Sequence, residues 1–272
     1  MKRVVPLEEA HEEALFGAKA VGLGQAIRDG LPVPPGFALS GDIVEAVASG
    51  ETRATQEVVK RVRPLGGPLA VRSSAVDEDG ASASFAGQHL TLLNVRTADD
   101  VSAALNKVWW SANSDSAITY RQKIGRFTRP SVGVVVQALL DPEAAGVMFT
   151  TNPVTGDDER VIEAAWGLGE AVVAALVIPD NFRIDRQGNV LERIPGYKKI
   201  AVRRAAEGGT IEDPLPPHLV EALSLNDDHL RQLHELASRC EVIYGPGRDI
   251  EWALSDGKIF LLQCRAITKA GA

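Results

Sequence analysis

The segment LAVRSSAVDEDGASASFAGQHLT, residues 69–91, changes character abruptly after a short apolar stretch. Leu69, Ala70 and Val71 predict a strand, and Arg72 stands at its expected end. Residues 73–87 are mostly small or acidic and follow neither a helical nor a strand period. Glycine and alanine leave backbone N–H groups uncovered, and serine adds hydroxyl donors. Such a loop therefore favours contact with an anion.

Arg72 beside this loop suggests a phosphate site. A guanidinium group presents several donors in a rigid fork and stays charged. An ordinary surface loop after a strand is the competing interpretation, and this segment alone does not separate the two.

Length and composition restrict the class of protein. The 272 residues suit one large domain or two lobes that share a cleft. A formal net charge of -7, without a block of Lys and Arg, argues against a general nucleic-acid surface. The most apolar run, residues 171–179, is too short to span a bilayer, and the N-terminus turns acidic too early for a signal peptide. Cys240 and Cys264 are too few for a disulfide framework or a metal site, so we expect a reducing, cytoplasmic setting.

A glycine-bearing turn at residues 17–24 is predicted to open a short helix that stops at Gly30. Lys19 would lie near the N-terminus of this helix, where the helix dipole disfavours a cation unless an anion is present. Lys19 is therefore either a phosphate-binding lysine or a solvated surface lysine.

The second half of the chain reads as strands followed by a long helix. Residues 132–139 predict a buried strand that one polar residue, Gln137, interrupts. Residues 205–217 are the best candidate for a loop. A long helix is expected over residues 218–244, with a polar break near 226–228.

The last hairpin, residues 249–265, allows a prediction of register. A three-residue loop with Gly257 in the left-handed conformation would place Asp249 opposite Gln263 and Glu251 opposite Leu261. A two-residue Asp-Gly loop would instead put Glu251 and Gln263 on opposite faces. The cleaner separation of polar from apolar residues favours the three-residue loop.

One face of this hairpin then collects Asp249, Glu251, Gln263 and Arg265. The other, apolar face collects Ile250, Trp252, Leu254, Phe260, Leu262 and Cys264. A carboxylate and an amide oxygen on one face can hold a divalent cation. A solvated face with an Arg–Asp pair is the alternative interpretation.

Seven motifs occur in an order that resembles a known family. They are GAKAVGLG at 17–24, VRSSA at 71–75, SFAGQ at 84–88, GVMF at 146–149, WGLGE at 166–170, DIEW at 249–252 and LQCR at 262–265. Nearly the whole chain resembles the N-terminal nucleotide-binding domain of phosphoenolpyruvate synthase, pyruvate phosphate dikinase and rifampin phosphotransferase. The resemblance implies an α+β, ATP-grasp-type fold with mixed, mainly antiparallel sheets. Its nucleotide cleft would lie between an N-terminal lobe, residues 1–130, and a C-terminal lobe, residues 131–272.

The resemblance also implies site roles and the cofactors ATP and Mg²⁺. Catalytic roles fall to Arg72 and Arg265. The other implied roles are phosphate binding by Lys19, Arg72 and Arg265, a closing loop with Gly87 and Thr91, a nucleotide contact at Gln137, and Mg²⁺ binding by Glu251 and Gln263. Phosphoryl transfer needs mainly such cations, which neutralise phosphate charge and align donor and acceptor.

The chain departs from its full-length relatives. None of its five histidines lies in a segment that resembles their swivelling phosphohistidine domain, and it ends soon after the last motif. Residues 50–69 also look short beside these relatives. The resemblance therefore implies an AMP-forming, dikinase-type phosphotransferase component. It would donate the β-phosphate of ATP to a histidine on a separate swivel protein, and an acceptor-binding protein would complete the reaction.

Three alternatives stay open at this stage. The chain could phosphorylate a small molecule directly, it could be a non-catalytic ATP-binding regulatory module, or it could be an excised domain of a longer protein. No nucleic-acid or membrane partner is expected.

Overall fold

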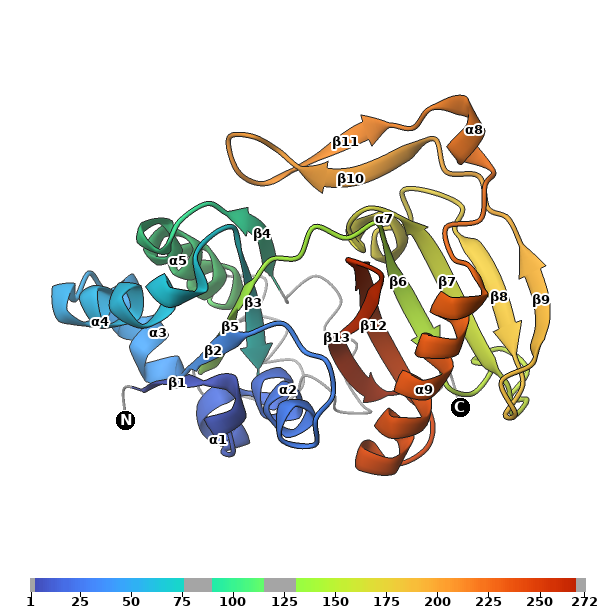
Figure 1. Ribbon diagram of the computed structural model, residues 1–272. Helices are drawn as coiled ribbons and strands as arrows, with labels where there is room; N and C mark the ends of the chain where they lie inside the picture. The colour runs from blue at the N-terminus through green and yellow to red at the C-terminus, as the bar shows by residue number, and fades with distance from the viewer. Residues whose placement is uncertain (1–2, 76–89, 115–130, 268–272) are drawn as a thin grey trace. The chain divides into compact units, whose positions relative to one another are not determined.

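A computed structural model describes residues 3–75, 90–114 and 131–267 of the chain (Figure 1). The chain divides into two compact units. Unit 1 comprises Met1–Ile27, Pro35–Leu139 and Ala206–Gly209, and unit 2 comprises Arg28–Pro34, Leu140–Ala205 and Thr210–Ala272. The main boundary follows Leu139, whereas the sequence suggested residue 130. The reason is that strand β5, Val132–Ala138, pairs with strands of unit 1.

Unit 1 contains a five-stranded antiparallel sheet in the order β1-β2-β5-β3-β4. Besides β5, its strands are β1 Val4–Pro6, β2 Gly36–Leu39, β3 Leu69–Ala75 and β4 Thr91–Val95. Its helices include α1 Glu13–Phe16, α2 Ala18–Arg28, α3 Gly41–Ala48, α4 Thr52–Val62 and α5 Val101–Ala112. Short 3-10 helices cover Leu7–Glu9, Arg63–Leu65 and Ala98–Asp100.

One face of this sheet packs against α3, α4 and α5 and forms the core of unit 1. From the sheet, the core takes the alternate residues Leu69 and Val71 of β3 and Val134 and Val136 of β5, all fully buried. Because side chains alternate across a strand, the residues between them point to the opposite face.

Strand β3 extends further than the sequence predicted. It continues from Arg72 through Ser73 and Ser74 to Ala75, where a small-residue loop was expected to begin. These residues pair with β5 from Val135 back to Val132. The ladder satisfies the backbone of residues that have low strand propensity, so pairing overrides the local preference. Arg72 therefore lies inside a strand.

Unit 2 is built on a six-stranded antiparallel sheet in the order β13-β12-β6-β7-β8-β9. Its strands are β6 Ala144–Phe149, β7 Arg160–Trp166, β8 Asp180–Ile184, β9 Val190–Ile194, β12 Arg248–Ser255 and β13 Lys258–Ala266. Its helices are α7 Glu170–Val173, α8 Pro217–Val220 and α9 Asp227–Tyr244. All ladders between the described strands are antiparallel, and the predicted α+β class with mainly antiparallel sheets is confirmed.

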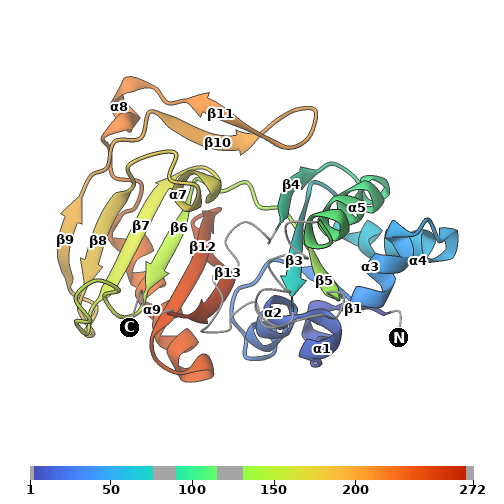
Figure 2. The same ribbon diagram turned by 180° about the vertical axis from the view of Figure 1, so that it is seen from behind.

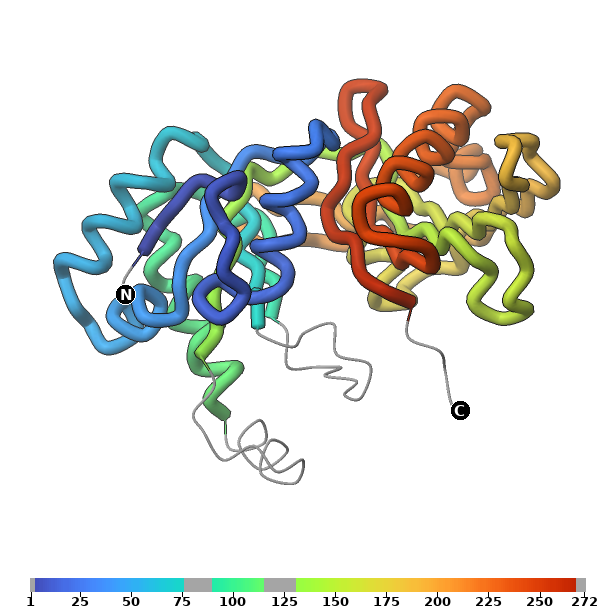
Figure 3. The backbone as a smooth tube through the Cα atoms, turned by 90° about the horizontal axis from the view of Figure 1, so that it is seen from below, coloured from blue at the N-terminus to red at the C-terminus, as the bar shows by residue number. Residues whose placement is uncertain are grey.

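Helix α9 lies across one face of this sheet and packs against β12 and β13 (Figures 1 and 3). Figure 2 shows the opposite face of the sheet. The helix begins where the side chain of Asn226 accepts a hydrogen bond from the His229 N–H at 3.0 Å, and it ends at Gly245 with φ +87°. The expected helix over 218–244 is thus divided into α8 and α9, and the predicted polar break is the N-cap of α9.

The predicted loop at residues 205–217 is interrupted by a strand, Thr210–Pro214, and ends where α8 begins at Pro217. Strands β10, Ile200–Arg204, and β11, Thr210–Pro214, form an antiparallel hairpin, and α8 follows at once. The loop prediction rested on the Gly and Pro content, yet Gly208 and Gly209 occupy only the turn, both with positive φ.

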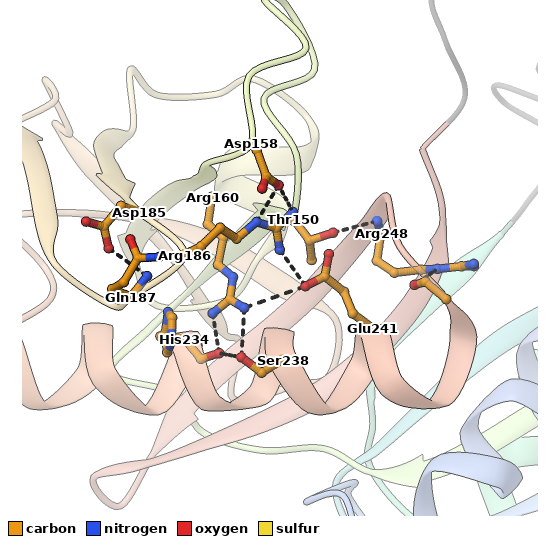
Figure 4. A network of polar contacts seen from close by, with 11 residues as sticks. Thr150, Asp158, Arg160, Asp185, Arg186, Gln187, His234, Ser238, Glu241 and Arg248 are labelled. Carbon is orange, nitrogen blue, oxygen red and sulfur yellow. Dashed lines mark hydrogen bonds and ion pairs between the residues drawn. The ribbon is translucent and has the colours of Figure 1, made fainter.

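A network of ion pairs and hydrogen bonds links α9 to β7 and to the β8–β9 turn (Figure 4). Arg160, nearly fully buried, donates to the His234 carbonyl oxygen and, at 2.7 Å, to Ser238 Oγ. Glu241 lies 3.6 Å from Arg160 and 2.7 Å from Arg186. Burial lowers the pKa of Arg160, and the charge of Glu241 opposes that shift. The network fixes the C-terminal half of α9 against the sheet.

Within the described part of the chain, no helix combines the length and the apolar character needed to cross a membrane.

Candidate functional site

Helix α2 brings Lys19 against the end of strand β3. Gly17, with φ +80°, immediately precedes the helix, and a Cβ atom there would come within 2.0 Å of the Ser74 carbonyl oxygen. The Lys19 ammonium donates to the Ser73 carbonyl oxygen at 2.9 Å, and the Ala20 N–H donates to Ser74 Oγ at 3.0 Å. Lys19 is only 7% exposed, so the interpretation as a solvated surface lysine is wrong.

Arg72, Thr91 and Gln137 share one face of the unit 1 sheet. Arg72 pairs with Thr91 on one side and with Val135 on the other, and Gln137 lies two residues from Val135. Directly paired residues point to the same face, as do residues two apart in one strand. This face is opposite the apolar core of α3, α4 and α5. Arg72 and Gln137 are 8% and 3% exposed.

The α1–α2 junction covers one end of the same face. Ser74, which contacts α2, pairs with Gly133 of β5, and a Cβ atom at Gly133 would lie 2.4 Å from the Phe16 carbonyl oxygen. At the other end, a Cβ atom at Gly36 would lie 2.6 Å from Gln137 Cγ. We call Lys19, Arg72, Thr91 and Gln137 the unit 1 polar face. Gly87, assigned to the closing loop by resemblance, lies outside the described residues.

The β12–β13 hairpin of unit 2 has a two-residue turn. Asp256 and Gly257 both have positive φ, +50° and +69°, and Ser255 pairs with Lys258 across them. The predicted three-residue loop is therefore wrong. A β-bulge then adds one residue, Leu262, to β13.

The bulge moves Gln263 opposite Glu251. Trp252 pairs with Leu261, but the next pair is Glu251 with Gln263, followed by Asp249 with Arg265. The predicted pairs, Asp249 with Gln263 and Glu251 with Leu261, are wrong. The predicted common face of these four polar residues nevertheless holds, because the bulge compensates for the shorter turn.

The predicted apolar face of the hairpin is wrong for Phe260. Phe260 pairs with Ala253, which is two residues from Glu251, so Phe260 lies on the polar face rather than in the predicted core face. Its place in the core is taken by Leu261 and Ile259, both buried.

Arg265 is held by an ion pair with Asp249. The Arg265 Nε and one terminal nitrogen each lie 2.8 Å from Asp249 Oδ2. Burial raises the pKa of Asp249, and the Arg265 charge opposes this shift. The Arg265 side chain remains 49% exposed. A guanidinium that is half exposed and held by a carboxylate is suited to contact an anion. We call Asp249, Glu251, Gln263 and Arg265 the unit 2 polar face.

Glu163 belongs to the same face and was missed in the sequence. It pairs with Val147 of β6, and Val147 pairs with Glu251, so the two glutamates lie in one row across the sheet. Burial raises the pKa of Glu163. The only signal in the sequence is a single acid within the apolar strand VIEAAW, residues 161–166.

The oxygen ligands that unit 2 offers suit a cation that also takes ligands from phosphates and water. Among the described residues, no group of three or more His, Cys, Asp and Glu side chains is placed to hold a metal ion. Glu251 and Gln263 offer one carboxylate and one amide oxygen from directly paired positions. Mg²⁺ suits such a pair, because it commonly takes one or two protein oxygens and completes its shell with phosphates and water.

The comparisons with known proteins assign the family. The family described as pyruvate phosphate dikinase, AMP/ATP-binding domain, matches residues 39–272. The chain belongs to this family of nucleotide-binding domains, as the resemblance of its motifs implied.

The curated relatives are longer proteins. A probable phosphoenolpyruvate synthase from Methanothermobacter thermautotrophicus is 33% identical over 100% of this chain and 47% of its own length. A rifampicin phosphotransferase from a Streptomyces species is 34% identical over 97% of this chain and 36% of its own length. The chain thus spans less than half the length of these relatives.

Solved structures that align with the chain include a ligase and a synthetase. D-alanine–D-alanine ligase from Bacillus anthracis complexed with ATP aligns over 91% of this chain and 54% of that chain, with 11% identity and a TM-score of 0.39. A dinucleotide-forming acetyl-coenzyme A synthetase from Ca. Korarchaeum cryptofilum aligns over 90% of both chains, with 10% identity and a TM-score of 0.47. At these TM-scores the likenesses carry no functional argument.

Proposed function

We propose that this chain binds MgATP with side chains of both polar faces and uses the nucleotide as a phosphoryl donor. The observation that carries the proposal is the bulged pairing of Glu251 with Gln263 beside the Asp249–Arg265 ion pair. Membership of a family of AMP/ATP-binding domains supports the nucleotide. Unit 1 supplies the buried cations Lys19 and Arg72, and unit 2 supplies the oxygen ligands Glu251 and Gln263.

In unit 1, Lys19 and Arg72 would bind the phosphates. Both side chains are nearly buried at the end or the centre of one sheet face, where a cation interacts with an anion more strongly than in bulk water. Gln137 would contact the nucleotide. Thr91 lies in strand β4, directly opposite Arg72, and not in the closing loop that the resemblance implied. From this position it would line the site beside the triphosphate.

In unit 2, Glu251 and Gln263 would hold Mg²⁺, and Arg265 would contact a phosphate oxygen. When bound, Mg²⁺ would neutralise charge on the phosphates and align them for transfer. Asp249 would keep the Arg265 guanidinium in place through the 2.8 Å contacts. Arg72 and Arg265 are the proposed catalytic residues, since both would stabilise charge on the group in transfer.

The phosphoryl acceptor is proposed to be a histidine on a separate protein, with AMP as the other product. The relatives carry at least as much additional chain as the part they share with this protein. Of the four histidines in the described residues, His229 and His234 lie on α9, on the far side of the sheet from Glu251, and none lies on a strand of either polar face. An acceptor-binding protein would then take the phosphoryl group.

Two measurements test this proposal. Calorimetric titration with ATP should show binding that needs Mg²⁺ and that is lost in Lys19→Met but kept in Lys60→Met, a matched lysine on the exposed face of α4. ATP labelled at its β-phosphate should then label a histidine protein from the same genome and release AMP. Direct labelling of a small molecule, without any labelled protein, would show that the acceptor is a small molecule and not a histidine. Magnesium-dependent binding without any turnover would instead favour a regulatory module.

A further inference from the structure

A second carboxylate–amide pair lies in the same row of the unit 2 sheet as Glu251 and Gln263. Glu163 of β7 pairs directly with Asn181 of β8, and it also pairs with Val147 of β6, the residue opposite Glu251. Strands β13, β12, β6, β7 and β8 lie side by side (Figure 2), and across them the row runs Gln263, Glu251, Val147, Glu163, Asn181. All five side chains point to the face opposite α9, because directly paired residues share a face.

The side chains of this second pair have no partner in the described part of the chain. Glu163 and Asn181 are both half-buried, yet among the described residues neither side chain has a hydrogen bond or an ion pair. Burial alone raises the pKa of Glu163, since no cation or donor opposes the shift. A half-buried carboxylate that loses hydration without gaining a donor is typical of a position that a ligand completes.

The backbone at Glu163 is fixed on both sides. Strand β7 is an interior strand, paired with β6 and with β8. A Cβ atom at Gly146 would lie 1.9 Å from the Glu163 carbonyl oxygen, so β6 and β7 approach closely at this point. Ile162 and Phe182, the sequence neighbours of the pair, are fully buried on the other face. A ligand on the polar face would therefore meet side chains that a rigid sheet holds in place.

We propose that Glu163 and Asn181 bind the imidazole of the acceptor histidine and present it to the phosphoryl group held at Glu251 and Gln263. This inference rests on the proposed function and names the place where its acceptor binds. Glu163 accepts a hydrogen bond from one ring N–H, the usual role of a carboxylate beside a histidine, and Asn181 packs its amide against the ring. The other ring nitrogen carries no proton and faces the phosphorus.

The spacing between the two pairs suits such an acceptor. Neighbouring strands lie about 4.8 Å apart and side chains stand roughly perpendicular to the sheet, so Glu251 and Glu163 are separated by roughly 9–10 Å. Reacting atoms ready for transfer lie about 3–3.5 Å apart, and a hydrogen bond from the ring to the carboxylate spans about 2.8 Å. The ring fills the remainder above Val147, which has no polar group to compete for it.

The transfer balances without a further reactant. The lone pair of the ring nitrogen forms the N–P bond while the bond from phosphorus to the leaving oxygen of the nucleotide breaks, and that oxygen keeps the electron pair. The ring gains a positive charge, which the Glu163 carboxylate stabilises until it accepts the proton from the opposite ring nitrogen. Because burial raises the pKa of Glu163, this carboxylate is a better base than an exposed one.

The first experiment uses imidazole alone as the probe and follows the side-chain amide signal of Asn181 by NMR in the full chain. Asn181→Ala assigns this signal by removing it. We expect imidazole to shift the signal saturably, and 1-methylimidazole, which has no ring N–H, to bind about fivefold more weakly or less. Glu163→Gln should weaken imidazole binding about fivefold to tenfold, because a neutral amide replaces a charged acceptor. Glu235→Gln, on the exposed face of α9, should bind imidazole as wild type does.

Two results of this titration overturn the proposal. One is an Asn181 signal that imidazole does not shift, or shifts equally in Glu163→Gln. The other is a signal that responds to Mg²⁺ and not to imidazole, which would make the pair a cation site.

The second experiment measures the reaction. In Glu163→Gln, transfer from labelled ATP to the histidine protein should fall about a hundredfold or more in kcat. Calorimetry should show MgATP affinity within about twofold of wild type, because Glu163 acts on the acceptor and not on the nucleotide. Transfer at the wild-type rate, or an equal loss of MgATP affinity, would overturn this role. If the wild-type chain neither binds MgATP nor labels a histidine protein, the proposed function fails, and the titration alone decides whether the pair binds imidazole.

Discussion

Glu251 lies directly opposite Gln263 in the β12–β13 ladder because one extra residue, Leu262, compensates for a two-residue turn. Cβ atoms of directly opposite residues are about 5 Å apart, a spacing from which a carboxylate and an amide oxygen can bind one cation. Without the bulge, the two side chains would point to opposite faces of the sheet.

This pairing predicts the behaviour of Glu251→Gln. The substitution keeps the size of the side chain but removes the charge that attracts Mg²⁺. We expect the dependence of ATP binding on Mg²⁺ to be lost, with affinity in Mg²⁺ falling about tenfold or more. Calorimetric titrations with ATP in the presence of Mg²⁺ and in the presence of EDTA measure this dependence. Glu235→Gln, an exposed acid on α9, is the control and should behave as wild type. Equal Mg²⁺ dependence in Glu251→Gln would remove Glu251 from the metal site.

Gly17→Ala should destabilise unit 1 through a collision that is absent at a comparable glycine. Gly17 and Gly50 have nearly the same φ, +80° and +81°, but only Gly17 has a neighbour within reach of a Cβ atom. Gly50→Ala therefore measures the cost of left-handed backbone alone, about 1–2 kcal/mol. Gly17→Ala should cost roughly 1–3 kcal/mol more, because of overlap with Ser74 and because the Gly17 ψ of 164° lies in a region that only glycine favours. Urea denaturation compares the two, and equal losses would contradict the close approach of α2 to β3.

Glu241→Ala should lower stability strongly. The substitution leaves Arg160 and Arg186 without their shared carboxylate, and Arg160 is almost entirely buried. Removing one partner of a buried ion pair costs about 3–5 kcal/mol. Exposed Glu235→Ala should change the free energy of unfolding by less than about 0.5 kcal/mol. Similar denaturation midpoints for the two variants would show that the network contributes little.

The pH dependence of stability should include a contribution from His234. Burial lowers the pKa of His234 below its ordinary value of 6.5, and the charge of Arg160 lowers it further. The other charged groups around it are Asp185, Glu235 and Arg186, and the two acids oppose the shift. The unfolded chain therefore binds a proton more readily than the folded chain. The contribution is fully present above pH 6.5 and is lost as pH falls toward the folded-state pKa.

His234→Gln should consequently flatten the loss of stability between about pH 7.5 and about pH 5.5. Urea denaturation at several pH values measures the free energy of unfolding for both proteins. An unchanged slope would contradict the assignment. His229→Gln is less suitable as a control, since His229 takes part in the capping box of α9.

The polar faces show what local sequence can predict. Alternation along a strand was enough to group Asp249, Glu251, Gln263 and Arg265. The rule needs only whether two residues are separated by an even or an odd number of positions. Alternation did not predict which of these residues pair. A two-residue turn combined with a bulge keeps the same residues on one face but shifts the register of the two strands. Packing of the core residues Leu261 and Ile259 decides between the two solutions, and that depends on residues distant in sequence.

The end of strand β3 and the position of Glu163 could not be predicted from local sequence, because both depend on strands that are distant in the chain. Ser73 and Ser74 have no strand propensity of their own, and only the ladder with β5 extends β3 to Ala75. Glu163 becomes part of a face only because β6 aligns it with Glu251 across the sheet. By contrast, a short helix that ends before Gly30 was predicted near Lys19, since helix ends carry local signals. The helix nevertheless begins at Ala18, so it includes most of the predicted glycine turn at residues 17–24.

The most direct test of the central claim, that both polar faces bind one MgATP, compares Arg72→Ala and Arg265→Ala. Calorimetry in the presence of Mg²⁺ measures ATP affinity, and far-UV circular dichroism checks that each variant folds. We expect each single variant to weaken binding at least about tenfold, because each removes a charged donor from the phosphates. We also expect the double variant to lose measurable binding. Unchanged affinity in either single variant would show that its polar face does not bind the nucleotide.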